Sequence, residues 1–495
     1  MSMEKEKKHP SVFEPFAIVL NLAVSVVGAI IGIQIVTTLG VTPSTSIIGA
    51  LVAMLIARIP MELFRKYKSI HRQNLMQTSI SSATFGAANS LLIPIGIPFI
   101  MGKTELILPM LIGVALAMFI DATLLYKLFD SRIFPARESW APGVATAESI
   151  LAGDKGGKRA GLLGIGALIG VIGSVLKIPM SALGVAFIGN IWALTMFGVG
   201  LLINQYSMPL FQLDVGKLYI AHGIMIGAGI VALIQVAVLI FKREDSAAEA
   251  SKENEAVTVP MRSVKRTLGL GYVAYLAVAV IIAVLGGLMT KMSAGMLIGF
   301  IIFAAFAAFF HELIVGIAAM HSGWFPAFAD MGYDLKTGYI LRGNGSDKEL
   351  EIRGRKQQYY TGMIAFGVAL LTVVLTYKGF FGQNLVPPID KVYASTINAG
   401  ASLDVAMKLL IWAIPGAIIQ WIGGPNRQLG VMLATGLLIV SPNACWAVLG
   451  GILIRVAVLK IKGKEAESTM SILAAGFIAG DALYSFFTSV FKASK

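Results

Sequence analysis

Few side chains that can exchange a proton lie inside the long apolar stretches of this sequence. These residues are Asp121, Glu148, His222, His311, Glu312, His321 and Asp481. Burial in a dry helical bundle moves the pKa of a carboxyl or imidazole group, so that the group can gain and lose a proton near neutral pH. Such groups are what a proton-coupled membrane carrier needs.

Asp481 is the strongest of these candidates for coupling transport to a proton or cation. It follows a Gly-x-x-x-Gly pair in the last apolar segment, where small side chains let a neighbouring backbone or a substrate come close. Glu148 and His222 are further candidates for proton coupling. The alternatives are a hydrogen bond from Asp481 to a neighbouring helix, a helix cap for Glu148 and a satisfied core histidine for His222.

The motifs of several enzyme classes are missing. The pair His311-Glu312 begins like a zinc-protease helix, but no histidine follows at the required spacing. No phosphate-binding Gly-Lys-Ser/Thr loop and no cofactor motif occur. The single cysteine, Cys445, excludes an intramolecular disulfide and a cysteine-rich metal centre. We therefore expect a protein that is not an enzyme and that has no cofactor or resident metal.

One segment, His71–Met101, combines polar side chains with helix-breaking residues between two apolar segments. Amides and hydroxyls fill its first half, and its second half contains the run Pro94–Pro98. Such a segment is tolerated at membrane depth only where protein buries it or where it lines a wet cavity. We predict that it lines a substrate path, with a counterpart around His321–Trp324; the alternative is that its side chains only hold helices together. The predicted substrate-binding residues are Asn74, Gln77, Thr78, His321 and Asn443.

The composition is that of a polytopic membrane protein. Of the 495 residues 56% are hydrophobic and 14% charged, and the mean hydropathy is +0.78. Soluble proteins carry about 25% charged residues. The net charge of +13 is explained by basic residues on cytoplasmic loops, so we expect a lipid bilayer as partner and no nucleic acid.

The positions of the apolar runs predict several membrane spans before residue 242. The expected spans are Pro15–Leu39, Pro43–Phe64, the polar segment from Asn74, Glu105–Leu125, Ala160–Leu176, Ala182–Ile203 and Leu218–Phe241. The stretch Ala141–Gly153 is amphipathic and too short to span. These spans leave the basic segment after Phe241 on the wrong side, so we predict that Ser181–Asp214 crosses twice through broken helices, with Asn190 inside it.

A charged linker, 242–264, divides the chain nearly in half. Short similarities occur in the same order on both sides of it, for example Gly200–Ile203 and Gly436–Ile439. We predict an all-α transmembrane bundle of about 12–16 segments in two homologous halves, 14–241 and 265–491, with broken or re-entrant helices. The tail 1–13 and the linker are expected to be cytoplasmic, and an extra polar insertion is expected at about 330–358.

Several motifs resemble those of the oligopeptide transporter superfamily, in particular its prokaryotic members and the yellow-stripe-like metal-chelate carriers. The matching segments are Asn74–Thr78, Ala145–Gly153, Asp334–Tyr339 with Arg355–Gln358 as one loop, Gly450–Arg455 and Gly476–Leu483. They follow the family order over most of the chain. Departures from the family pattern include Arg72 and Gln73, where a Glu and an Asn are usual, and Asp481, where a Glu is usual.

The resemblance implies a secondary active transporter. We expect proton-coupled uptake of small peptides or peptide-like metal chelates across the plasma membrane, with a cytoplasmic N-terminus and a possible homodimer. A passive channel or a membrane-embedded enzyme is the alternative. A channel repeats a short pore element in several subunits, and an enzyme shows converging ligands or a nucleophile with its base; the sequence shows neither pattern.

Overall fold

The protein is all-helical, as its sequence predicts. The computed structural model describes residues 9–39, 45–241, 258–285, 294–322, 327–399, 402–425, 427–439, 441 and 443–493. Over these ranges no strand forms apart from one isolated bridge between Phe129 and Phe134. Most of the linker 242–264 and residues 323–324 of the expected counterpart around His321–Trp324 lie outside the described residues.

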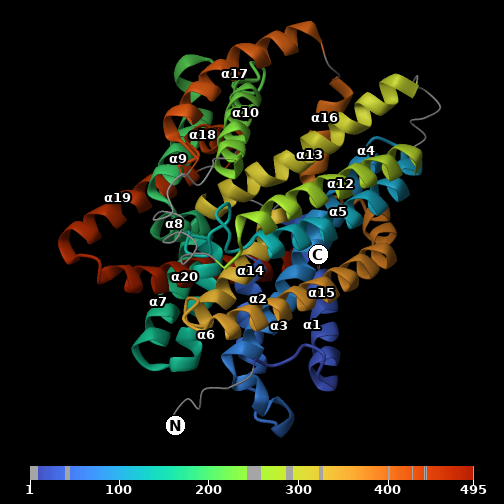
Figure 1. Cartoon of the computed structure of the whole chain (residues 1–495). Helices are drawn as coiled ribbons and strands as arrows, with labels where there is room; N and C mark the ends of the chain where they lie inside the picture. The colour runs from blue at the N-terminus through green and yellow to red at the C-terminus, as the bar shows by residue number, and fades with distance from the viewer. Residues whose placement is uncertain are drawn as a thin grey trace.

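In the described ranges nineteen α-helices form, and Figure 1 labels them. Before residue 242 they are α1 (Pro15–Leu39), α2 (Thr45–Ile56), α3 (Ile70–Phe85), α4 (Ile93–Ile100), α5 (Ile107–Leu128), α6 (Ala141–Lys155), α7 (Gly157–Val175), α8 (Met180–Ile188), α9 (Ile191–Phe211) and α10 (Ile220–Phe241). After residue 257 they are α12 (Met261–Leu285), α13 (Ala294–Ser322), α14 (Ala327–Leu341), α15 (Lys348–Gly382), α16 (Pro388–Ala399), α17 (Leu403–Gly423), α18 (Leu429–Leu438), α19 (Ala444–Lys462) and α20 (Ala466–Ala493). Three short irregular helices lie at Glu62–Lys68, Gly86–Leu92 and Thr104–Leu106.

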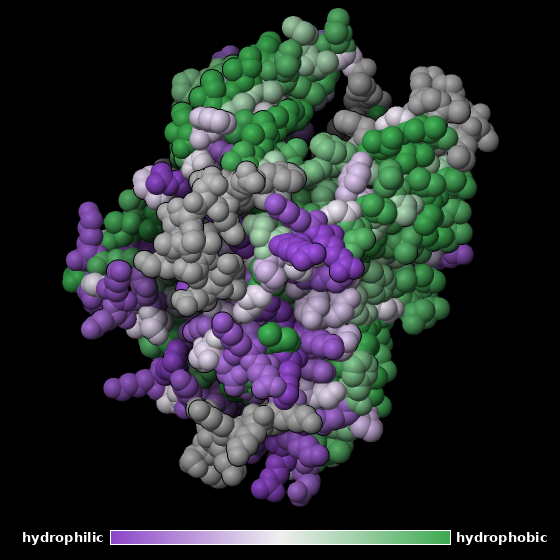
Figure 2. Space-filling model, viewed as in Figure 1, coloured by the Kyte–Doolittle hydropathy of each residue, from purple (hydrophilic) through white to green (hydrophobic). Residues whose placement is uncertain are grey.

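The helices are long and apolar enough for a multi-pass membrane protein. In the described part of the chain nine helices can cross a bilayer by length and composition, and three more apolar helices are shorter. Apolar side chains cover the outer faces of α10, α12 and α17, whereas hydrophilic side chains gather in the lower middle of the view (Figure 2). An apolar outer surface of this extent requires lipid around it.

Two predicted boundaries differ from the structure. The first span matches α1, but the second, Pro43–Phe64, is too long, because α2 already ends at Ile56. Pro60 follows four residues later; it lacks an N–H and disfavours helical conformation in the residue before it. The span Ala182–Ile203 is not a single helix either, and its division agrees with the broken helices that are predicted across Ser181–Asp214. It divides into α8 and α9 at Asn190, whose side chain accepts hydrogen bonds from the N–H groups of Trp192 and Ala193.

The polar segment forms one irregular helix. Residues Ile70–Ile100 run continuously through α3, a π-helical turn at Gly86–Leu92 and α4. The expected break at Pro94–Pro98 is therefore wrong. Pro94 has no N–H group, so one backbone hydrogen bond of the helix is missing. The wider π-helical turn before Pro94 accommodates this change, and the helix continues.

Helices α7–α10 pack in reverse order against α17–α20, and we call these the exchanged helix pairs. α7 packs against α20 and α10 against α17, while α8 packs against α19 and α9 against α18 (Figure 1). Glycines bring the first two pairs into backbone contact. A Cβ atom on Gly476 would lie 2.7 Å from the carbonyl oxygen of Leu163, and one on Gly227 would lie 1.8 Å from that of Ala413. Only glycine permits so close an approach.

Candidate functional site

The polar half of α3 is buried in protein, where it meets α2, α14 and α15. Ten polar side chains come together there, and we call them the polar core. They are Thr45, Ser46, Asn74, Gln77, Thr78, Ser81, Ser82, Asp330, Asp334 and Gln358. All ten are buried. The α3 members are three or four residues apart, which places them along neighbouring positions of one helix surface.

Asp334 is the acceptor at the centre of the polar core. Gln77 donates from Nε2 to its Oδ1 at 2.5 Å, and Ser46 donates to the same oxygen at 3.0 Å. Asn74 extends the chain by donating from Nδ2 to Oε1 of Gln77 at 3.1 Å. The other amide atom of Asn74, Oδ1, is buried and has no hydrogen-bond partner among the described residues. The chain of amides therefore ends in an acceptor that is open to a donor.

Asp330 lies one helical turn before Asp334 on α14, so both carboxylates face the same side. It accepts hydrogen bonds from Thr45 at 2.9 Å and from Ser81 at 3.3 Å. Neither carboxylate forms an ion pair with any residue that the structure describes. Two negative charges buried together without a cation are costly, so such a pair favours uptake of a proton or a cation.

Gln358 connects the polar core to a set of buried charges on α15 and in the turn after α14. Its Nε2 donates to Oγ1 of Thr78 at 3.2 Å and to the carbonyl oxygen of Asp334 at 2.7 Å. Its Oε1 accepts a hydrogen bond of 2.8 Å from Arg342. Arg342 in turn donates to Glu351 at 2.7 Å, with both side chains fully buried. Gln358 therefore joins the polar core directly to the buried ion pair of Arg342 and Glu351.

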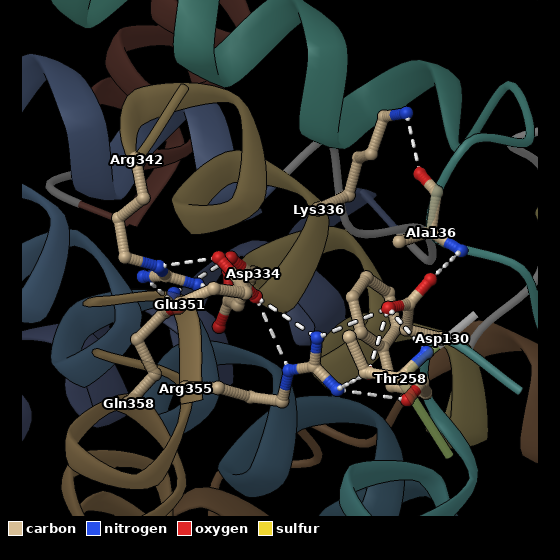
Figure 3. Close-up of polar contacts among 10 residues, drawn as sticks. Asp130, Ala136, Thr258, Asp334, Lys336, Arg342, Glu351, Arg355 and Gln358 are labelled. Atoms are coloured by element: carbon tan, nitrogen blue, oxygen red, sulfur yellow. Dashed lines mark hydrogen bonds and ion pairs between the residues drawn. The ribbon is translucent and has the colours of Figure 1, made fainter. Parts of the chain in front are cut away.

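The buried charges continue from Glu351 to the segment before α12. Arg355 pairs with Glu351 at 3.0 Å and with Asp130 at 3.6 Å (Figure 3). Asp130 follows α5 and accepts a hydrogen bond of 2.7 Å from Thr258, which precedes α12. This network joins α14 and α15 to two segments that are distant in sequence.

Lys336 points away from these charges (Figure 3). Its Nζ donates to the carbonyl oxygens of Ala136 at 2.7 Å and Glu138 at 2.9 Å. Burial lowers the pKa of Lys336 to about 8. The helix therefore presents Asp334 to the polar core and Lys336 to the loop before α6, so the lysine does not neutralise the two aspartates.

Three of the five predicted substrate-binding residues meet in the polar core, namely Asn74, Gln77 and Thr78. His321 belongs to the last turn of α13, but its side chain is outside the described atoms. Asn443 is exposed at the start of α19, which packs against α8, α9 and α20 rather than the polar core. The structure therefore gathers three of these residues and does not place the other two with them.

The predicted coupling residues have partners outside the polar core. Asp481 accepts hydrogen bonds from Oγ of Ser174 at 2.6 Å and from N and Oγ of Ser181 at 3.0 and 2.5 Å. Because Ser181 lies in the first turn of α8, Asp481 stabilises that end of the helix. Glu148 lies inside α6, not at a cap, and pairs with Arg159 at 2.5 Å. His222 is exposed on α10, with Tyr219 beside its ring.

Seven residues of the polar core are not among the predicted site residues, and they include Asp330, Asp334 and Gln358. The expected polar insertion at 330–358 is largely helical, since it comprises most of α14 and the start of α15. The family-like motif Asp334–Tyr339 is likewise helix rather than loop. Aspartates four residues apart in an otherwise apolar helix were the available signal, because that spacing places both on one face.

Comparison with known proteins identifies one family. The family model described as OPT oligopeptide transporter protein matches residues 15–241 and 322–492. The match covers more than half of the chain and includes every residue of the polar core. No curated protein and no solved structure matches the chain.

Proposed function

The chain belongs to the oligopeptide transporter family, and we propose that it is a secondary active transporter that uses protons to import its substrate. The proposed substrates are small peptides or peptide-like metal chelates, taken up across the plasma membrane. The N-terminus and the linker 242–264 are proposed to be cytoplasmic, since basic residues gather next to the first apolar segment and in the linker.

The uncompensated pair Asp330 and Asp334 is the observation that carries this proposal. Two buried carboxylates without a cation in the described structure are poised to take up positive charge. Gln77 donates a hydrogen bond directly to Asp334, and Asn74 donates to Gln77. A substrate that contacts these amides would therefore sense the protonation of Asp334 through a single side chain, which is the linkage a symporter requires.

The alternatives explain the polar core less well. A passive channel has no use for two buried acids that hold hydroxyls and amides in place. A membrane-embedded enzyme needs a nucleophile with its base or a bound metal, and no group of three or more metal-ligating side chains occurs in the described ranges.

Uptake into proteoliposomes tests the proposed function. A labelled tripeptide and a labelled ferric peptide chelate would each be supplied at an acidic outside pH, with and without a protonophore. We expect accumulation of one class above its equilibrium level, and we expect the protonophore to abolish it. Equal uptake with and without the gradient would instead support a passive channel.

Charge-neutral variants separate the candidate coupling residues in the same assay. Asp334→Asn keeps the shape of the side chain but removes one charge from the uncompensated pair, so gradient-driven accumulation should be lost while substrate exchange persists. Asp481→Asn should do the same if Asp481 couples transport as we proposed from the sequence; if Asp481 only stabilises α8, accumulation should persist with a lower thermal stability. Glu148→Gln and His222→Gln test the other two proposed coupling residues in the same way.

The substrate-binding proposal is tested by affinity. Asn74→Ala and Gln77→Ala should each raise the substrate concentration needed for half-maximal uptake. His321 and Asn443 remain proposed contacts, and alanine at each position belongs in the same series. Unchanged affinity in a variant that is present at wild-type amounts would remove that residue from the site.

A further inference from the structure

A second acidic group lies outside the polar core and has no partner at all among the described residues. Asp390 sits in the first turn of α16 and is fully buried, with an exposed fraction of 0%. Neither Oδ1 nor Oδ2 has a hydrogen-bond partner in the described structure. Buried polar groups are almost always hydrogen-bonded, so a carboxyl group with two open oxygens requires an explanation.

Asp390 is pressed against the proline-containing turn of α4. A Cβ atom on Gly96 would lie 1.8 Å from Oδ2 of Asp390, so only glycine leaves room for this carboxyl group. Gly96 lies between Pro94 and Pro98, and neither proline has an N–H group to donate. Pro98 also leaves the carbonyl oxygen of Pro94 without its usual helical donor. The carboxyl group therefore faces a turn that is short of donors and has an acceptor to spare.

No charge among the described residues around Asp390 compensates a carboxylate. The helix α16 packs against α4 and α1, and neither of these contains a charged or titratable residue. The connection 383–387 also has none, although Val386 touches the same glycine. The other charged or titratable side chains of α16 are Lys391 and Tyr393, which are exposed. An ionised Asp390 would be an unpaired buried charge, which is far more costly than a neutral carboxylic acid.

We propose that Asp390 is a proton-binding site, separate from the polar core, whose carboxyl group is neutral while α16 and α4 are in contact. The proton leaves for water when the two helices separate, and the resulting carboxylate then opposes their return. The inference extends the proposed proton coupling by adding a second titrating group at the irregular helix. Burial raises the pKa of Asp390 to about 8, and α16 is not among the nine helices long enough to span the bilayer.

Infrared difference spectroscopy tests the site without any substrate. The purified protein is titrated between acidic and alkaline pH, and the carbonyl stretch of buried carboxylic acids is followed in the wild type, Asp390→Asn and Asp404→Asn. Asp404 is a matched control because it is an exposed aspartate paired with Lys408 in the first turn of the next helix. We expect the signal of one protonated acid at neutral pH to be missing only in Asp390→Asn.

Two results of this titration would overturn the proposal. The first is identical spectra of Asp390→Asn and the wild type at every pH. The second is a carboxylate signal at Asp390 that responds to added sodium rather than to pH, which would assign a metal cation to the site. Because no transport is measured, either result stands whether or not the protein is a symporter.

Transport assays then test whether the site serves coupling. Asp390→Asn resembles the protonated form permanently, so the pH dependence of tripeptide or ferric-chelate uptake should flatten while substrate exchange continues. Gly96→Ala should have a similar effect by displacing the carboxyl group, whereas Gly367→Ala, at a position with open space, should not. A wild-type pH profile in Asp390→Asn would overturn the coupling role. If the wild type itself shows no gradient-driven uptake, the proposed function fails, and the infrared result still decides the site.

Discussion

Glu351 holds two arginines at the start of α15. Arg342 reaches it from the turn after α14, and Arg355 reaches it from one turn later on α15; all three side chains are buried. Burying charges costs free energy that close pairing only just repays. The removal of Glu351 would leave two cations without their carboxylate, and the free energy of unfolding would fall.

The expected loss for Glu351→Gln is about 3–5 kcal/mol, the cost of breaking a buried ion pair from one side. Thermal unfolding in detergent micelles measures the direction and rank of this effect. Glu349→Gln is the matched control, because Glu349 pairs with Arg353 across the same four-residue spacing but on the surface. That change should cost below about 1 kcal/mol. Equal losses in the two variants would show that burial of the pair is unimportant.

At the scale of residues, the sequence predicts the α3 residues of the polar core and misses the aspartates of α14. Asn74, Gln77 and Thr78 stand out because amides are rare in an apolar neighbourhood and must find partners. Gln77 and Thr78 find their partners, Asp334 and Gln358, 257 and 280 residues away, in a segment polar enough to resemble an insertion. Only the packing of α14 onto α3 shows that the aspartates of α14 are inside.

At the scale of helices, contact between α7 and α20 depends on glycine. A Cβ atom on Gly480 would lie 2.1 Å from the carbonyl oxygen of Ala167, and backbone cannot move aside as a flexible side chain can. Gly480→Ala should therefore destabilise the protein, by about 1–3 kcal/mol for overpacking. Thermal unfolding of the variant in micelles checks this.

The direction of the stability change distinguishes a crowded glycine from one in open space. In a helix with open space, alanine is favoured over glycine by about 1 kcal/mol. Gly450→Ala on α19 meets that condition, because nothing lies within 4 Å of the added atom. It should leave the unfolding temperature unchanged or raise it. A raised unfolding temperature for Gly480→Ala as well would mean that the two helices are not in close contact.

Predicted and observed helix limits agree where length and hydropathy decide them. The first span, Pro15–Leu39, coincides with α1. The break between α8 and α9 at Asn190 falls inside the segment that is predicted to contain broken helices. The limits disagree near Pro60, because the apolar run continues past Ile56 and hides the end of α2. The irregular turn before Pro94 is of the same kind, since the composition indicates a disturbance but not whether the helix breaks or widens.

At the scale of the whole molecule, the exchanged helix pairs support the proposal of two homologous halves. Gly227 approaches the carbonyl oxygen of Ala413 as Gly476 approaches that of Leu163. The two glycines lie about 250 residues apart in the sequence, and so do Leu163 and Ala413. Related halves that exchange helices surround a shared interface. In the sequence, the Gly-x-x-x-Gly pair Gly476 and Gly480 is the sign of this close helix contact.

The proposed topology of these halves can be tested by cysteine labelling. A cysteine at Ser246, in a Cys445→Ala background, lies in the linker that we propose to be cytoplasmic. A membrane-impermeant maleimide should label it only after the cells are opened. Labelling in intact cells would place the linker outside and reverse the orientation of both halves.

The contact between α7 and α20 also governs the order in which the protein can be completed. Gly166 and Gly476 meet across about 310 residues of chain. Synthesis at roughly 5–20 residues per second separates the insertion of these two helices by about 15–60 s. During that interval the glycine face of α7 has no native partner and stays open to lipid or to insertion factors. The helix α7 therefore reaches its native packing only after α20 has been inserted.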